Sequence, residues 1–490
     1  MRRRSNVGLP IRKCRRRSIR GEMAAQGSVL THPEPRHRLF PMPTLAAASR
    51  TAVHEELPAA AVTALLAALT LSIGSSTKVD LLFLVGLPLT LVGFAYATQS
   101  VWTIGRHTSR SWIVQASTWL SAMAAWGLVT SSMHAAPWHE VARRVYALSG
   151  VLAVGTVVDG NDRLRRRVVH LMVAGAVILH LLTPLALPRP PIDVLSVTQS
   201  SVEALLRGVH PYTIQPHDAT NGAFDYGYKL TVYPYMPLTL LMYAPAVAFL
   251  GDFRYVLAAS FAVTIVLFGW IGRRVGADAK LVDAAMLALA LHPMSLWFTA
   301  NGWTEGLIVC LLTTFVYLAV CAPDGISQAI VFFLLPSLKQ YIVAPALLYV
   351  GMKPPRVRLR MAVIAVGVML ASVGPFLVWG WHPTIAGMVF QMRHLERPRV
   401  DSDSLVALAA LLTGRYPTVW LSAVVQIIVG ALVYPRVRQS GLAGFLAGSA
   451  LSLYATFLVG WQAFVNYYYL ISVALLLAAI VASRPTGRPA

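Results

Sequence analysis

The sequence predicts an all-α membrane protein, a bundle of transmembrane helices, from two observations. First, 56% of the 490 residues are hydrophobic and only 12% are charged, whereas a soluble domain carries about 25% charged residues. Second, continuous apolar runs of roughly 18–22 residues recur along most of the chain, and runs of that length cross a bilayer as helices. Both observations exclude an ordinary soluble enzyme.

We predict about fourteen spans, with eleven as the lower bound. Each is an apolar run set off by loops that contain Lys, Arg, Pro or Gly. The predicted spans are residues 57–76, 81–98, 112–133, 145–159, 169–187, 233–250, 255–272, 280–298, 304–322, 327–350, 361–380, 417–434, 441–459 and 464–483.

Positive charge predicts the orientation. The net charge is +21, and residues 1–50 alone hold 12 Lys and Arg against two acids. Because basic segments stay in the cytoplasm, residues 1–56 are expected to form a disordered cytoplasmic tail beside anionic lipid, and the C-terminus is expected on the same side. Two basic pairs, Arg143 with Arg144 and Arg273 with Arg274, would then lie outside, and they mark where a hairpin could be miscounted.

This orientation places two long loops outside the cell, 188–232 and 381–416. The first contains Asp193, six residues after the apolar run that ends at Leu187, behind a stiff Pro-Arg-Pro-Pro segment. Apolar residues of the 196–208 segment are spaced for a short amphipathic helix on the membrane surface, and Gly208 would end it. Long loops in a tight bundle commonly carry function.

These motifs resemble a known family. An acid after a membrane helix, a surface helix that ends in Gly-x-x-Pro-Tyr, and a return through "VYPYMPL" resemble the GT-C class of integral-membrane glycosyltransferases. In particular, they are similar to the polyprenol-phosphate-mannose-dependent mannosyltransferases of glycosyltransferase family 87. "GPFLVWGWHP", "QMRHLERPRVDSDSL" and "WQAFVNYYYLI" are similar to that family's later segments. The resemblance covers residues 166–485. Residues 57–165 would add about four helices that the family pattern lacks.

The resemblance implies the reaction. A sugar, mannose first, would pass from a polyprenyl phosphate to a cell-envelope glycolipid or glycan outside a bacterial plasma membrane. Asp193 would be the general base that takes the proton of the acceptor hydroxyl, an effect on the order of 10²–10⁴-fold. The alternative is that Asp193 only caps the helix that follows it, or is solvated.

The leaving phosphate needs cations. The second outer loop offers Arg393, His394, Arg397 and Arg399, and Arg grips phosphate through paired hydrogen bonds. The alternative is an interfacial loop attracted to lipid.

Lys339 is placed mid-span, where an ionisable residue faces a cavity or a partner. Lipid phosphate and a buried carboxylate are both possible partners. Glu305 falls on the cytoplasmic side by this count. A shift of one span would make it a second external acid and a rival for the role of base.

Aromatic and imidazole side chains at the predicted outer surface are candidates for binding substrate or lipid. Anchoring at the membrane interface is the alternative for the tyrosines, and it is the favoured one for those of the last helix. These candidates are His210, Tyr212, Tyr233, Tyr235, Tyr467 and Tyr468.

No nucleotide-binding fingerprint and no metal-ligand spacing is present in the sequence. We therefore expect no metal, no cofactor and no nucleic-acid partner, with membrane lipid, the lipid-linked sugar and the acceptor as partners. Two alternatives stay open: a transporter or flippase of a lipid-linked sugar, and a non-catalytic membrane assembly protein. A transporter would place its essential acid within the bundle rather than in an outer loop.

Overall fold

A computed structural model describes residues 57–74, 86–103, 107–108, 112–129, 136–159, 161–188, 193–214, 232–390, 398 and 402–484. The predicted cytoplasmic tail, 1–56, lies outside these residues. The chain from His54 onward forms one compact unit.

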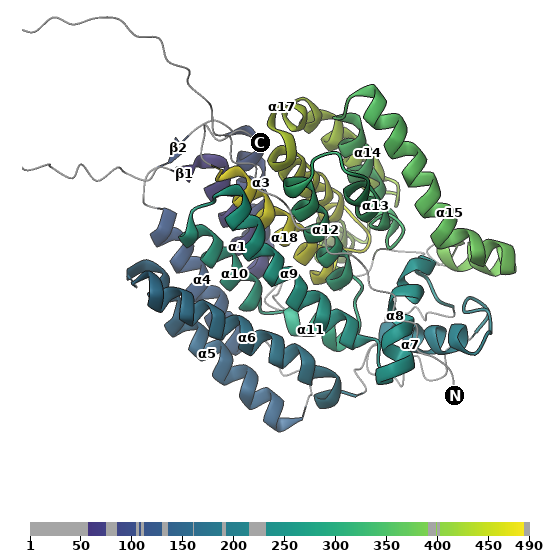
Figure 1. Ribbon diagram of the computed structural model, residues 1–490, viewed down its shortest axis with the longest axis horizontal. Coiled ribbons are helices and arrows are strands. Elements are labelled where there is room, and N and C mark those ends of the chain that lie inside the picture. Colours follow the sequence, from purple (N-terminus) through teal and green to yellow (C-terminus); the bar gives the residue numbers. More distant parts are fainter. Residues whose placement is uncertain are drawn as a thin grey trace, which may run out of the picture. The chain divides into compact units, whose positions relative to one another are not determined.

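The described part of this unit is almost entirely helical (Figure 1). A single antiparallel pair, β1 (Leu57–Pro58) with β2 (His107–Thr108), accompanies the helices. The helices are α1 (Ala59–Gly74), α3 (Leu87–Trp102), α4 (Trp112–Val129), α5 (Pro137–Asp159), α6 (Asp162–Ala186), α7 (Asp193–Leu206), α8 (Pro237–Leu250), α9 (Arg254–Val275), α10 (Ala279–Ala290), α11 (Ser295–Asn301), α12 (Glu305–Cys321), α13 (Ile326–Leu334), α14 (Val343–Gly351), α15 (Pro355–Ile385), α16 (Leu405–Thr413), α17 (Leu421–Leu458) and α18 (Val465–Ala482).

Five of the described helices, α6, α9, α15, α17 and α18, are long and apolar enough to cross a membrane. The number is six if α10 and α11, bent by 41°, form one broken span. The predicted class, an all-helical membrane-embedded protein, is confirmed.

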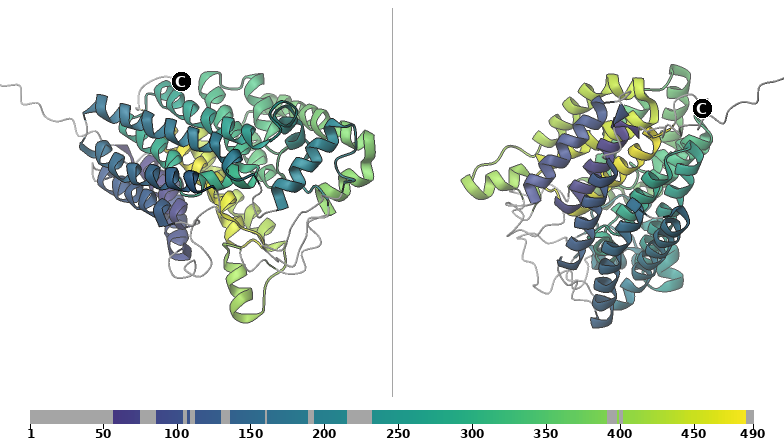
Figure 2. Two further views of the ribbon diagram at one scale, coloured as in Figure 1. Left: turned by 90° about the horizontal axis from the view of Figure 1, so that it is seen from below. Right: turned by 90° about the vertical axis from the view of Figure 1, so that its left-hand side faces the viewer.

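The core is built around α18. It packs against α1, α9, α10, α12 and α17, and α1 lies beside it in Figure 2. Nearly every residue of α18 is buried, as expected for a helix that is apolar on all sides.

A glycine turns α17 back on itself. Gly441 has φ +61° and ψ −138°, a conformation open to glycine but not to residues with a Cβ atom. The Ser452 hydroxyl donates to the carbonyl of Gln426, 26 residues earlier, so the two halves of α17 run antiparallel. They correspond to the two predicted spans 417–434 and 441–459.

The predicted span 327–350 is not one helix. It consists of α13, a 3₁₀ turn (Gln340–Ile342) and α14, with Lys339 extended between them at φ −146° and ψ 133°. Pro336 explains the break, because proline cannot continue the hydrogen bonds of a helix. At the other end of this stretch Lys353 pairs with Asp324, so α13 and α14 form a hairpin with Lys339 near its tip.

The predicted span 233–250 also differs. Arg254, which begins α9, donates to the carbonyls of Pro184 and Leu187 at the end of α6. The chain between α6 and α9 therefore returns to the end of the bundle that it left. Helix α8 lies beside α7 in this segment (Figure 1) and does not reach the opposite end.

These contacts define two ends of the bundle. The "Asp193 end" contains Leu187, Asp193, Arg254 and Glu305. The "Arg165 end" contains Arg165 and its partner Asp283, at the beginnings of α6 and α10. Arg273 and Arg274, in the last turn of α9, belong to the Arg165 end. The count of alternating spans had placed them with the outer loops instead.

Candidate functional site

Asp193 is the first residue of α7 and is half-buried. A carboxylate in the first helical turn is favoured by the partial positive charge of the helix N-terminus. The short helix predicted after Asp193 is present as α7, which starts three residues earlier than expected, and Gly208 lies just past its end with φ +72°. The position of α7 on the membrane surface stays a prediction.

Arg254 fixes the chain that leads to Asp193. Its guanidinium donates to both carboxylate oxygens of Asp252 and to the carbonyls of Leu187 (2.7 Å), Ala300 (3.2 Å) and Pro184 (3.2 Å). It is 1% exposed. One buried cation thus joins the end of α6, the start of α9 and the end of α11.

A glycine brings the starts of α7 and α12 together. Gly302 ends α11 with φ +69°, and a Cβ atom there would lie 2.5 Å from the Phe253 ring and 3.4 Å from Leu195 of α7. The close approach therefore requires glycine. Leu195 is two residues after Asp193, and Glu305 is three residues after Gly302. Both acids consequently belong to the Asp193 end.

Glu305 and Lys339 form a buried ion pair. Lys339 Nζ donates to Glu305 Oε1 at 2.9 Å, with side-chain exposures of 8% and 0%. The hydroxyl of Tyr341 donates to the same oxygen at 3.2 Å. No described residue donates to Glu305 Oε2, which is fully buried. Of the two partners expected for Lys339, the structure shows the buried carboxylate.

Three tyrosine rings surround the ammonium of Lys339. Its Nζ lies 4.7 Å from the ring centre of Tyr235, 5.4 Å from that of Tyr467 and 5.9 Å from that of Tyr341. Each distance is within the range of a cation–π interaction. We call Tyr235, Tyr341 and Tyr467 the tyrosine cage.

Tyr235 connects this pair to Asp193. Burial raises the pKa of the Tyr235 phenol well above its usual value, and the neighbouring Tyr467, Glu305 and Asp193 raise it further. Tyr235 thus packs on the Lys339 ammonium, at the end of the bundle that also contains Asp193.

An aromatic wall continues from the cage. Ring centres are 5.5 Å apart from Tyr235 to Tyr233, 5.5 Å from Tyr233 to Tyr212, 5.9 Å from Tyr212 to His210 and 4.9 Å from His210 to Trp379. The Tyr212 hydroxyl donates to the carbonyl of Tyr235 at 2.5 Å. Four predicted binding residues thus pack in one aromatic cluster, in which His210, Tyr212 and Tyr233 are buried and Tyr235 is half-buried.

The three tyrosines that begin α18 point in three directions, because successive helical residues are about 100° apart. Tyr467 joins the cage. Tyr468 packs against Tyr454 and donates to the carbonyl of Asp403, and Tyr469 packs against His292 and Phe298. Tyr468 is fully buried and Tyr469 is 2% exposed, so these two are core residues and do not anchor at the membrane interface. The structure does not bring Tyr468 together with the other candidates.

The predicted phosphate-binding residues Arg393, His394, Arg397 and Arg399 lie outside the described residues.

The span count placed Glu305 on the cytoplasmic side, but the structure places it at the same end as Asp193. The basic pair Arg273 and Arg274, on the wrong side in that count, was the signal that could have corrected it.

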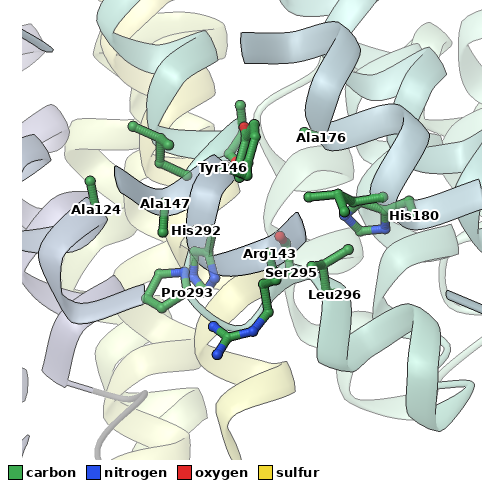
Figure 3. A pocket seen from close by; sticks show the side chains of 13 residues that line it. Ala124, Arg143, Tyr146, Ala147, Ala176, His180, His292, Pro293, Ser295 and Leu296 are labelled. Carbon is green, nitrogen blue, oxygen red and sulfur yellow. The ribbon is translucent and has the colours of Figure 1, made fainter. Parts of the chain in front are cut away.

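A separate cavity lies between the added helices and the rest of the bundle (Figure 3). Tyr146 and Ala147 of α5, His180 of α6, and His292 and Leu296 near the α10–α11 break are among its lining residues. Its volume is about 30 Å³, enough for about two water molecules and too small for a sugar.

Within the part of the chain that the structure describes, no three His, Cys, Asp or Glu side chains are grouped to hold a metal ion. The Asp193 end offers two carboxylates, one buried ammonium and a cluster of tyrosines. No known protein-family model matches the chain, and a search of curated proteins finds no match.

Proposed function

We propose that the protein is an integral-membrane glycosyltransferase of the GT-C kind. It transfers a sugar, mannose first, from a polyprenyl phosphate to a cell-envelope glycolipid or glycan on the outer side of a bacterial plasma membrane. The observation that supports this most is the grouping at one end of the bundle: Asp193 begins α7 there, and the buried Lys339–Glu305 pair lies beside the tyrosine cage at the same end.

In the proposed reaction Asp193 takes the proton of the acceptor hydroxyl. The hydroxyl oxygen attacks the anomeric carbon from the face opposite the phosphate, and the bond from that carbon to the phosphate oxygen breaks. The lipid phosphate leaves with the bonding electrons, and the product has inverted configuration. Lys339 stabilises the charge that develops on the phosphate, together with Arg393, His394, Arg397 and Arg399 of the outer loop.

The proposed topology keeps about fourteen crossings. Helix α8 is removed from the count, and α13 and α14 enter as two crossings instead of one. The Asp193 end then faces outward, and both termini are cytoplasmic. The Arg165 end collects Arg273 and Arg274 with the other cytoplasmic cations, which agrees with the bias of Lys and Arg toward the cytoplasm.

The test is sugar transfer in membranes from radiolabelled polyprenyl-phosphate mannose. We expect Asp193→Asn to reduce the transfer rate by at least about 100-fold, because an amide cannot accept the proton. The matched control is Glu203→Gln on the same helix. Among the described residues the Glu203 side chain pairs only with the exposed Arg207 and with Gln199, so the substitution should leave the rate unchanged. Equal transfer by Asp193→Asn and wild type would remove Asp193 from the mechanism.

A second candidate is a flippase or transporter of a lipid-linked sugar. The specific observation in its favour is the buried Lys339–Glu305 pair, because charges inside a bundle are typical of transport pathways. Translocation of the labelled lipid in proteoliposomes without transfer of its sugar, together with indifference to Asp193→Asn, would favour it.

A further inference from the structure

The inference concerns Glu305, which the proposed reaction does not use. Its Oε1 accepts from both Lys339 and Tyr341, while Oε2 has no hydrogen-bond donor among the described residues and the side chain is 0% exposed. A buried carboxylate oxygen without a donor is costly. An arrangement of this kind in a native protein therefore calls for a functional reason.

We propose that Glu305 is a positioning residue that acts through Lys339 on the phosphate of a lipid-linked substrate. It supplies the counter-charge that keeps the buried Lys339 ammonium in its charged form and holds it between the rings of the tyrosine cage. The inference rests on the proposed function and adds to it the residue that prepares the phosphate-binding cation.

Geometry assigns this role to Glu305 and leaves that of base to Asp193. The oxygen of Glu305 that has partners is occupied by two donors, and the whole side chain is buried, so an acceptor hydroxyl cannot reach it. Asp193 is only half-buried at the start of α7, so it is the more accessible of the two acids.

Lys339 retains the capacity to bind a second anion. An ammonium has three donors, and among the described residues Nζ donates only to Glu305. The rings of Tyr235 and Tyr467 attract the cation through their faces without a carboxylate's negative charge. Tyr235, Tyr341 and Tyr467 are each only half-buried, and the adjacent Gln340 is exposed, so the cage has an open edge.

The counter-charge is needed because a buried ammonium without an anion favours its neutral form. A neutral amine would bind phosphate poorly. With Glu305→Gln, the charge of Lys339 would therefore depend on pH in the range where the wild type is fully charged.

The experiment measures binding of a polyprenyl phosphate without sugar to the purified full-length protein, by intrinsic fluorescence at pH 7.0 and pH 8.5. We expect Glu305→Gln to weaken binding about tenfold at pH 7.0 and further at pH 8.5. The ratio of variant to wild-type affinity is compared between the two pH values, because the titration of the phosphate itself affects both proteins equally and cancels in that ratio. In the transfer assay the KM for the donor should rise while kcat changes little.

Two variants separate this role from a structural one. Glu305→Gln combined with Lys339→Met should bind no more weakly than Lys339→Met alone. Asp283→Asn removes one partner of another buried ion pair, at the Arg165 end, and should change stability but not lipid-phosphate binding. If Glu305→Gln does not fold, Glu305→Asp, which keeps the charge, takes its place with a smaller and pH-independent loss of affinity.

Three outcomes for Glu305→Gln would overturn the inference: tighter binding, an affinity ratio that is the same at both pH values, or full additivity with Lys339→Met. For Glu305→Asp, an affinity loss that grows with pH or that is fully additive with Lys339→Met would overturn it. Loss of kcat at constant KM would also overturn it and make Glu305 the base. If the wild type binds polyprenyl phosphate in the predicted Glu305-dependent way but transfers no sugar, the inference stands and the proposed glycosyltransferase function fails.

Discussion

Two buried cations at the Asp193 end, Arg254 and Lys339, differ in how many hydrogen-bond acceptors surround them. The Arg254 guanidinium is saturated by one carboxylate and three backbone carbonyls. The Lys339 ammonium has one carboxylate oxygen and three aromatic rings. Both are at least nine-tenths buried. Burial alone therefore does not separate a structural charge from a functional one, whereas the remaining bonding capacity does.

The Arg165 end supports this distinction. Arg165 is 2% exposed and binds Asp162 and Asp283, each at 2.7 Å. Like Arg254, it is paired with carboxylate oxygens at short distances, and no aromatic ring of the described residues caps its guanidinium. We interpret Arg165 and Arg254 as structural cations that hold the helices together at the two ends, and Lys339 as a cation that binds substrate.

The largest expected loss of stability follows from removing the Arg254 guanidinium. Arg254→Met would leave the carbonyls of Pro184, Leu187 and Ala300 without this donor, and Asp252 without its partner. Breaking a buried charged network by removing one partner costs about 3–5 kcal/mol, so the melting temperature in detergent should fall by several degrees and transfer should fall with it.

The matched control for this prediction is Arg207→Ala. Arg207 is on the same end of the bundle but is exposed, at 3.8 Å from Glu203, and exposed pairs contribute about 0–1 kcal/mol. If Arg254→Met is as stable as the control, the guanidinium does not stabilise the fold. The distinction between a structural Arg254 and a functional Lys339 would then be wrong.

A smaller effect is expected from Gly387→Ala, which alters the aromatic wall and leaves the Arg254 network intact. A Cβ at Gly387 would lie 2.3 Å from the Tyr212 ring and 2.6 Å from the carbonyl of Tyr233. Overpacking of this kind costs about 1–3 kcal/mol. Because the wall must shift, we expect polyprenyl-phosphate binding to weaken by more than the modest drop in melting temperature suggests.

Gly374→Ala is the control, since it lies on α15 with nothing within 4 Å of its Cβ position. It should be neutral or slightly stabilising and should bind normally. Unchanged binding by a folded Gly387→Ala protein would separate the aromatic wall from the substrate site.

The sequence predicted the parts of the fold that depend on local pattern. Apolar run length predicted the membrane helices, and the spacing of Val197, Val202, Leu205 and Leu206 predicted α7. Local pattern did not predict which apolar runs cross the membrane, and therefore did not predict the end of the bundle at which each loop lies. An apolar run such as 233–250 has the same composition whether it crosses a membrane or packs beside another helix at one end of the bundle, and only the contacts of Arg254 with the end of α6 distinguish the two.

The site was predictable to a similar degree. The rarity of intramembrane charge singled out Lys339, and the predicted partner type, a buried carboxylate, is present. Its identity as Glu305 required the hairpin at Pro336 and the return of the chain at Arg254, two tertiary features. The separation of Tyr468 from Tyr467 is different: helical geometry alone predicts that neighbouring residues face different directions, and the sequence already carried that information.

The smallest effect is expected for a partly exposed ion pair at the open end of the α13–α14 hairpin, opposite Lys339. Lys353 binds Asp324 at 2.8 Å, with side-chain exposures of 17% and 41%. Burial by itself would lower the pKa of Lys353, but the hydrogen bond to Asp324 and the neighbouring Tyr349 raise it above its usual value. A raised pKa in the folded state means that the pair stabilises the fold below the unfolded pKa of about 10.4 and loses this contribution as pH rises through the folded value.

We therefore expect Asp324→Asn to lower the melting temperature slightly at pH 7–9, and the difference from wild type to shrink as pH rises above about 10.4. Asn suits this test because Asp324 has φ +60°, and Asn also adopts that conformation, so the substitution removes charge without backbone strain. Melting curves of both proteins from pH 7 to pH 11.5 measure the difference. A gap that stays constant across this range would mean that the pair does not act through the charge of Lys353, and a gap as large as that of Arg254→Met would contradict the ranking of the pairs by their burial and bonding.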